Sequence, residues 1–140
     1  MGDSQVALDV EIPSDVKYIE DVIELATRKC RELSIPHRKC SLNVRVALTE
    51  AISNAILRGN GDAADKHVRV RAVVSDAALV FDVTDEGAGF DLAAHRPDPT
   101  APENLLLEDG RGLFLMQRLM DRVERFQADG NVVRLTLNRE

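Results

Sequence analysis

The feature that most constrains this chain is the alternation of apolar and polar residues with a period of two, in paired segments that flank short turns. Residues 67–83 alternate in this way on both sides of a Ser-Asp turn, and residues 123–137 do so around an Asp-Gly-Asn turn. This pattern is typical of half-buried strands joined as β-hairpins. A further alternating segment, from Val6 to Ile12, predicts one more strand near the N-terminus. Hairpins make a sheet largely antiparallel, with one face against a core.

Three segments with apolar residues at helical spacing predict the layer that covers this sheet. The first follows Ser14, which we expect to be its N-cap, and the others cover about residues 41–57 and 112–120. Helices packed on one face of such a sheet form an α/β two-layer sandwich. We therefore predict this fold class, with a mixed, mostly antiparallel sheet, in a single domain that spans residues 1–140.

Composition and charge exclude several classes of protein. The 140 residues are 44% hydrophobic and carry a formal net charge of -6, which argues against a general binder of nucleic acid or of anionic membranes. No export signal is recognisable and no apolar stretch approaches the ~18 residues of a membrane span, so we expect a cytoplasmic protein without a membrane partner. Cys30 and Cys40 are expected to be buried free thiols, because neither has a partner at metal-site spacing.

Three short motifs carry residues with chemical potential. Glu50 and Asn54 are four residues apart on the second predicted helix, so both project from one face, and a carboxylate beside an amide suits a magnesium ion. Residues 85–89 (DEGAG) follow a strand, and their two glycines allow the backbone to approach a ligand closely. Residues 110–112 (GRG) open a helix, where unpaired N–H groups favour anions. Taken singly, these motifs are also compatible with a solvated helix face and plain turns.

The order of the three motifs is more specific than any one of them. About 25 residues separate the second motif from the third, a length that is usual for functional loops. The set resembles the GHKL (Bergerat-fold) ATPase superfamily, with Glu50 and Asn54 in the N box and the two glycine motifs in the two glycine boxes. Within it, residues 50–59 and 112–121 resemble the anti-sigma factor and serine-protein kinase family (RsbW/SpoIIAB-like). The resemblance extends over essentially the whole chain.

This resemblance implies a bacterial partner-switching regulator of transcription. Such a protein is a homodimer that binds a sigma factor and, with ATP and Mg²⁺, phosphorylates a serine of a STAS-domain anti-anti-sigma protein. By position, Glu50 would orient or deprotonate the serine hydroxyl, Asn54 would bind Mg²⁺, and Asp85 would recognise the adenine amino group. A lid over ATP would cover about residues 86–111. The other residues implied in nucleotide binding are Arg58, Gly87, Gly89, Gly110, Arg111, Gly112 and Leu113.

Two positions depart from the family pattern. An arginine usually precedes the second glycine box, whereas this chain has Glu108 and Asp109 there, so a γ-phosphate contact would come from Arg111 or Arg58. Asn131 stands where a threonine often lies near the adenine. Negative charge near the γ-phosphate opposes transfer and favours an alternative, a nucleotide-gated regulatory binding module without phosphotransfer.

Two further classes of protein are less consistent with the sequence. The detached ATP-binding domain of a histidine kinase would follow a pair of phosphoacceptor helices, and none precedes the first predicted strand. An α/β interaction protein that binds no nucleotide would require three motifs to occur in the correct order by chance. The sequence thus predicts a nucleotide-binding regulator with kinase activity.

Overall fold

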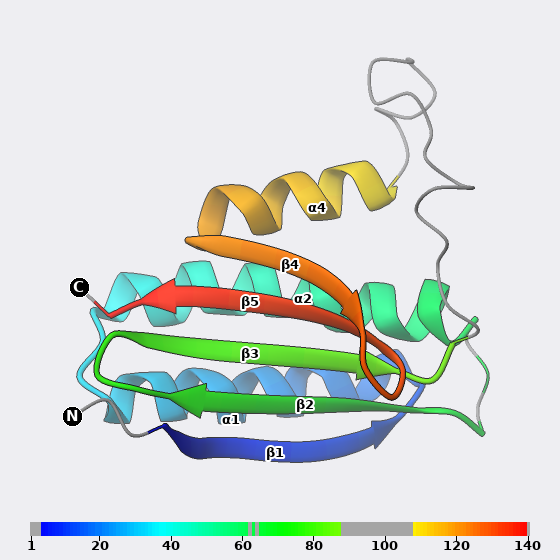
Figure 1. The fold of residues 1–140 in the computed structure, drawn as a ribbon, viewed down its shortest axis with the longest axis horizontal. Coiled ribbons are helices and arrows are strands. Elements are labelled where there is room, and N and C mark those ends of the chain that lie inside the picture. Colours follow the sequence, from blue (N-terminus) through cyan, green and yellow to red (C-terminus); the bar gives the residue numbers. More distant parts are fainter. Residues whose placement is uncertain (1–3, 62, 64, 88–107, 140) are drawn as a thin grey trace.

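The computed structural model describes residues 4–61, 63, 65–87 and 108–139 of the 140-residue chain (Figure 1). Its elements are, in chain order, β1 (Gln5–Pro13), a 3₁₀ turn η1 (Val16–Tyr18), α1 (Ile19–Glu32), η2 (Lys39–Val44), α2 (Arg45–Asn54), η3 (Ala55–Gly59), β2 (His67–Val74), β3 (Ala78–Asp85), α4 (Glu108–Leu119), β4 (Arg122–Gln127) and β5 (Asn131–Asn138). The segments η2 and η3 are wide π-type turns that continue α2 at both ends, so the second helix is longer than the sequence predicted.

The five strands form one sheet in the order β1-β2-β3-β5-β4. All pairings between the described strands are antiparallel, whereas the sequence predicted a mixed, mostly antiparallel sheet. Register follows the hydrophobic pattern, because one residue of slip would move every side chain to the other face. One row across the buried face consists of valines from four strands: Val10, Val70, Val83 and Val133.

One face of the sheet is covered by helices, as Figure 1 shows, with α1 and α2 side by side behind the strands and α4 next to α2. The core lies between these two layers. Its largest fully buried side chains include Leu79, Phe81, Leu135 and Leu137 from the sheet and Ile23, Leu48, Ile52, Ile56 and Met116 from the helices. The predicted α/β two-layer sandwich is therefore confirmed.

The opposite face of the sheet carries charged side chains in complementary rows. Opposite charges alternate along one row across all five strands: Asp9, Arg71, Asp82, Arg134 and Glu124. The guanidinium of Arg134 binds the Asp82 carboxylate through two hydrogen bonds of 2.8 and 2.9 Å, which raises the pKa of Arg134. Arg69 binds Asp9 in the same bidentate way and lowers the pKa of that carboxyl group. Complementary pairs across strands stabilise the observed register.

The start of the first helix differs from the prediction. Asp15, not Ser14, caps η1, and its Oδ1 accepts a hydrogen bond of 3.0 Å from the Lys17 N–H. Ser14 is buried and its hydroxyl donates to the Lys66 carbonyl oxygen at 2.9 Å. The prediction was wrong because both residues are good N-caps, and the choice between them depends on a tertiary partner 52 positions away.

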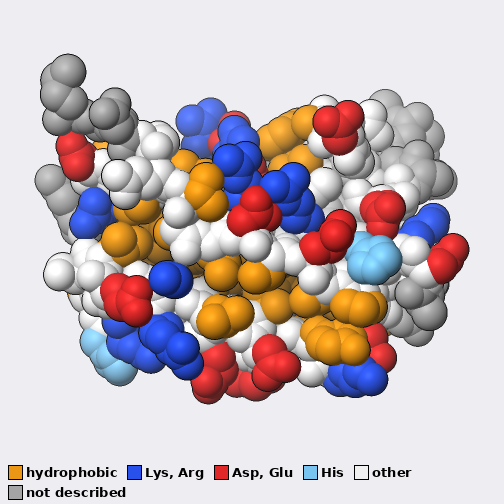
Figure 2. Space-filling model, turned by 90° about the horizontal axis from the view of Figure 1, so that it is seen from below, with side chains coloured by type: hydrophobic (Ala, Val, Ile, Leu, Met, Phe, Trp, Pro, Cys, Tyr) orange, Lys and Arg blue, Asp and Glu red, His pale blue; other side chains and the backbone are white. Residues whose placement is uncertain are grey.

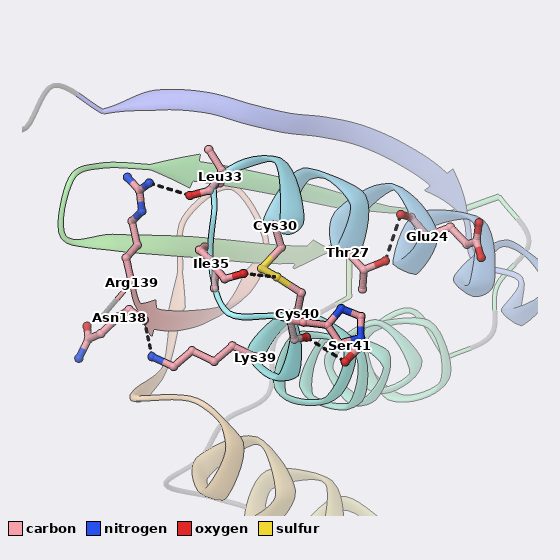
Figure 3. The surroundings of a disulfide bond; sticks show 11 residues. Glu24, Thr27, Cys30, Leu33, Ile35, Lys39, Cys40, Ser41, Asn138 and Arg139 are labelled. Atoms are coloured by element: carbon pink, nitrogen blue, oxygen red, sulfur yellow. Dashed lines mark hydrogen bonds between the residues drawn. A yellow bond between two sulfur atoms is a disulfide. The ribbon is translucent and has the colours of Figure 1, made fainter.

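The two cysteines also differ from the prediction. They are fully buried, as expected, but they form a disulfide between the last turn of α1 and η2 (Figure 3). The bond closes a loop over a sequence separation of 10 residues. The expectation of free thiols rested on composition and motif spacing, neither of which shows that the end of α1 and the start of the next helix bring these residues together.

Among the residues that the structure describes, β1 pairs only with β2, so the outer edge of β1 is open there. Figure 2 looks onto this side of the molecule and shows hydrophobic side chains gathered along its middle, with charged side chains on the margins. Val6 and Val16 are 51% and 53% exposed, and Ala7, Val10 and Ile19 are partly buried against the core. None of the helices among the described residues is long and apolar enough to cross a membrane.

Candidate functional site

The N box lies on the helix that is packed between the sheet and α4. The side of α2 that faces the sheet is formed by small and aliphatic residues that are fully buried, namely Ala47, Leu48, Ala51 and Ile52. Glu50 and Asn54 fall outside this stripe and are only partly buried. Both face α4, where a Cβ added to Gly112 would lie 2.9 Å from the Oε2 of Glu50 and 3.2 Å from the Nδ2 of Asn54. The fold thus brings the N box against the second glycine box.

The Asn54 amide is a buried polar group with unused hydrogen-bonding capacity. Its Nδ2 is the one buried side-chain nitrogen or oxygen without a hydrogen-bond partner among the residues that the structure describes. Buried polar groups are normally paired, so an unpaired one at a site needs an explanation such as a ligand. The unpaired atom is an N–H donor, so it suits an acceptor such as a phosphate oxygen. The amide oxygen of the same side chain suits Mg²⁺, which keeps water and phosphate oxygens as its remaining ligands. Asn54, with the Glu50 carboxylate beside it, therefore fits a magnesium–nucleotide complex.

The described residues alone supply too few ligands to hold Mg²⁺ without a nucleotide. Groups of three or more His, Cys, Asp or Glu residues that could hold a metal ion do not occur among the described residues. The amide oxygen of Asn54 would leave most of the coordination shell of Mg²⁺ to other groups, which is the usual arrangement in kinases and ATPases. The site is thus suited to a metal that arrives with phosphate groups.

Asp85 is the last residue of β3 and is only 8% exposed. Its Oδ1 accepts two hydrogen bonds, at 2.8 Å from the Gly87 N–H and at 2.9 Å from the Nδ2 of Asn131. No described residue donates a hydrogen bond to Oδ2, so this oxygen remains able to accept one from a ligand. Asn131, which stands where the family often has a threonine, therefore supports Asp85, because its amide is hydrogen-bonded to the carboxylate directly.

Three glycines from three separate connections crowd around Asp85. A Cβ on Gly59 would lie 2.0 Å from the Oδ2 of Asp85, and one on Gly87 would lie 1.7 Å from the carbonyl oxygen of Gly59. Gly130 adopts a φ of +129° and a Cβ there would lie 2.3 Å from the Asp85 carbonyl oxygen. The sequence placed Gly87 in a glycine motif and Gly130 in a hairpin turn, and it gave no functional role to Gly59. Their shared role in packing against Asp85, through its carboxylate or its backbone, is visible only in the structure.

Asn60 is a residue of this site that sequence reasoning missed. It follows the helix-ending Gly59, and its side chain is almost fully buried. Its Nδ2 donates to the Ser14 hydroxyl at 2.7 Å and to the His67 carbonyl at 2.9 Å, and its Oδ1 accepts from the Glu86 N–H at 2.7 Å. An asparagine after such a glycine is typical of an exposed turn, so local sequence carries no signal for this role.

The second glycine box lies inside α4 rather than before it. The helix begins at Glu108, four residues earlier than the predicted start at Gly112. The first four N–H groups of a helix lack intrahelical partners, so the free donors include those of Gly110 and Arg111 but not that of Gly112. The prediction was wrong by one turn because glycines suggest a helix boundary, whereas here Gly112 makes room for Glu50.

The remaining predicted site residues are less closely grouped. Arg58 is exposed on η3, and Leu113 is partly buried against the hydrophobic core. The side chain of Arg111 is not among those described. Gly89 and residues 88–107, which make up most of the predicted ATP lid, lie outside the described residues.

Comparison with known proteins places these features in a family context. A family model described as the histidine kinase-like ATPase domain matches residues 12–137. The chain is 30% identical to the serine-protein kinase RsbW of Bacillus pumilus, in an alignment that covers 100% of this chain and 91% of the relative. It is 31% identical to RsbW of Bacillus subtilis, covering 92% and 83%. It is 26% identical to the anti-sigma F factor of Clostridium beijerinckii, covering 70% and 69%.

A solved structure supports the same fold. The RsbU and RsbW domains of a Mycobacterium tuberculosis protein match with a TM-score of 0.64, over 95% of this chain and 33% of that chain. The sequence identity is 16%, so this likeness concerns the fold alone. This chain spans about a third of that solved chain.

Proposed function

Because this chain belongs to the histidine kinase-like ATPase domain family, we propose that it is an anti-sigma factor that uses ATP to phosphorylate a serine of an antagonist protein. The observation that carries the proposal is the contact of Gly112 with Glu50 and Asn54, which joins a carboxylate, an amide and the start of α4 in one place. The relatives named serine-protein kinase RsbW support the choice of serine as the acceptor. The single domain of residues 1–140 and its lid at about 86–111 are part of the proposal.

The chemistry assigned to the chain is a direct phosphoryl transfer. The oxygen of the acceptor serine attacks the γ-phosphorus of ATP while the carboxylate of Glu50 takes the hydroxyl proton, and ADP leaves. Such reactions depend mainly on positioning and on charge stabilisation. Mg²⁺, held in part by Asn54, would neutralise charge on the phosphates. The N–H groups of Gly110 and Arg111 would donate to phosphate oxygens, because they belong to the unpaired first turn of α4.

The adenine end of the nucleotide is assigned to Asp85. Its Oδ2 would accept a hydrogen bond from the adenine amino group, while Oδ1 stays bound to Gly87 and Asn131. Gly87 and Gly89 would form the base of the lid, Arg58 would add positive charge near the phosphates, and Leu113 would contribute an apolar contact. With these assignments, the bound nucleotide would extend from Asp85, at the end of β3, to the start of α4.

The proposed partners follow from the same family. A sigma factor would be held inactive, and a STAS-domain anti-anti-sigma protein would be the phosphorylated antagonist, which places the reaction in the bacterial cytoplasm. We also propose a homodimer through the open β1 edge. The exposed Val6 and Val16 and the apolar band beside them support this surface, because an unpaired edge strand with apolar neighbours is suited to association.

The decisive experiment combines partner identification with a carboxylate variant. The tagged chain is used to recover partners from its native lysate with MgADP or MgATP, and phosphoserines are identified by mass spectrometry. The recovered STAS protein is then purified and incubated with labelled ATP and with wild type or Glu50→Gln. We expect the variant to transfer phosphate at least about 100-fold more slowly, as is typical when a general base is lost, while ADP affinity stays within threefold.

Controls for this experiment come from the chain itself. Glu24→Gln makes the same change on an exposed face of α1 and should transfer phosphate at the wild-type rate. Transfer by Glu50→Gln at the wild-type rate would remove Glu50 from the reaction.

A nucleotide-gated binding module without phosphotransfer is the second candidate function. The position of Glu108 and Asp109 favours it, since α4 begins at Glu108 and both acidic residues therefore occupy its first turn, next to the proposed phosphate donors. Partners whose affinity depends on ADP or ATP, without any phosphoserine, would identify this function instead.

A further inference from the structure

A closed ring of hydrogen bonds joins the end of the second helix to the first glycine box. The Nδ2 of Asn60 donates to the His67 carbonyl at 2.9 Å, the His67 N–H donates to the Oε2 of Glu86, and the Glu86 N–H donates to the Oδ1 of Asn60 at 2.7 Å. Asn60 is only 2% exposed, so water competes poorly for its two bonds in the ring, whereas the bond between His67 and Glu86 is exposed. The ring therefore fixes three chain segments relative to one another.

The ring acts at the point where the sheet no longer controls the backbone. Pairing of β3 with both of its neighbours ends at Asp85, opposite Val68 on one side and Asn131 on the other. Glu86 is the first residue beyond this ladder, and the Oδ1 of Asn60 replaces the missing strand partner of its N–H. The next N–H, that of Gly87, turns back to the Asp85 carboxylate at 2.8 Å. Asn60 thus determines where the backbone goes directly after Asp85.

Asn60 also belongs to the helix that carries the N box. It lies six positions beyond Asn54, at the end of the continuous turns of α2 and η3, and its N–H is bonded to the Ala55 carbonyl at 2.9 Å. A rigid helix therefore connects the proposed phosphate end of the site with the ring at the proposed adenine end. Displacing either end of this helix would change the distance between the two.

We propose that Asn60 is a positioning residue for nucleotide recognition, which holds Asp85 and Glu86 at a fixed distance from Glu50 and Asn54. This inference rests on the proposed function, because it assumes that Asp85 binds the adenine amino group. Asn60 itself touches no part of the nucleotide in this account. It acts through the Glu86 backbone, so its loss should reduce the preference for adenine more than it reduces binding of phosphate groups.

The test is the ratio of the affinities for ADP and inosine diphosphate, which lacks the amino group. A hydrogen bond to a charged acceptor corresponds to about a tenfold to hundredfold preference, which we expect for wild type. Asn60→Ala should lower this ratio at least threefold, whereas Ser14→Ala should leave it within twofold. Ser14→Ala is a matched control. The Ser14 hydroxyl accepts a hydrogen bond of 2.7 Å from the Nδ2 of Asn60, so its removal loosens the ring without removing the acceptor for the Glu86 N–H. Calorimetric titrations are made well below the melting temperature of each variant.

Each outcome decides between the claims. A wild type that does not prefer ADP refutes the assignment of Asp85 and, with it, this inference. A wild type that prefers ADP, together with Asn60→Ala at an unchanged ratio, refutes the inference alone. An equal loss of preference in Ser14→Ala shows a general loosening of the fold and also refutes the positioning role.

A measurement without any variant covers the case in which Asn60→Ala does not fold. Hydrogen exchange followed by NMR reports on the Glu86 amide in nucleotide-free wild type. We expect this amide to exchange at least tenfold more slowly than an unprotected loop amide, because Asn60 accepts its proton in a buried position. Exchange at the unprotected rate would overturn the proposal.

Discussion

Replacing Gly112 with alanine should separate the stability of this protein from its proposed activity. The new Cβ would lie 2.9 Å from the Oε2 of Glu50 and 3.2 Å from the Nδ2 of Asn54. Ordinary contact begins at 3.4 Å, so the Glu50 carboxylate must retreat by about half an ångström and the Asn54 amide by less. Both groups are the far ends of flexible side chains, and they can move without displacing the backbone.

The expected change in stability is small because two effects oppose each other. Gly112 lies within α4, where alanine is favoured over glycine by about 0.8–1 kcal/mol. Moving the Glu50 side chain away from its preferred rotamer costs about 0.5–1.5 kcal/mol. With an unfolding entropy of about 0.29 kcal/mol/K for 140 residues, either effect alone shifts the melting temperature by only a few degrees. We therefore expect a melting temperature within about 3 °C of wild type.

The expected change in activity is much larger. A misplaced catalytic group slows a reaction by about tenfold to hundredfold even when it remains in the site. Phosphotransfer to the STAS protein is measured with labelled ATP, next to thermal unfolding followed by circular dichroism. Gln117→Ala, on the exposed side of α4, is the matched control and should transfer at the wild-type rate. Wild-type transfer by Gly112→Ala would refute the reasoning, since the contact with Glu50 and Asn54 would then have no part in the reaction.

Three further outcomes concern the fold. Reduction of the Cys30–Cys40 disulfide should lower the free energy of unfolding by about 2.7 kcal/mol, which is the loop-closure entropy for 10 residues, and the melting temperature by about 9 °C. Detection of two titratable thiols in the unreduced, unfolded protein would contradict the disulfide. Phe81→Ala should lower stability by about 3–5 kcal/mol in urea unfolding, because this fully buried side chain leaves a cavity, and a loss below 1 kcal/mol would place it outside the core. Arg69 lowers the pKa of Asp9, so their pair should stabilise the fold at neutral pH and lose this effect as pH falls through the lowered pKa. The free energy of unfolding of Asp9→Asn should then depend slightly less on acid pH than that of wild type. An unchanged dependence would mean that the pair does not contribute to stability.

The fold and the N box were largely predictable from sequence because both depend on periodicity. Alternation in the strands predicted the hairpins, and a spacing of four predicted that Glu50 and Asn54 share a face of α2. The contact of Gly112 with both side chains was not predicted, because no local pattern relates the two segments in space. Whether these residues bind magnesium and nucleotide stays a prediction.

The features that sequence reasoning missed depend on partners far along the chain. Ser14 was expected to cap a helix, but its hydroxyl bonds Lys66, and that bond exists only once β1 and β2 have paired. Asn60 was not singled out by any local pattern, yet it links three segments whose proximity is a property of the whole fold. Local propensity gives the set of conformations that a residue accepts, and tertiary contacts select one of them.

The crowding around Asp85 has a consequence for how the family can change in length. Gly59, Gly87 and Gly130 belong to three connections that all touch this carboxylate or its backbone, so an insertion in any of them would displace the others. The turn between β2 and β3 lies at the opposite end of those strands, away from Asp85, and it is bonded instead to Arg139, which donates to the carbonyl oxygens of Ser75 and Ala77 (Figure 1). Residues added there during evolution should therefore leave the surroundings of Asp85 undisturbed. The same turn is where a fluorescent label for partner-binding assays can be attached without disturbing the nucleotide site.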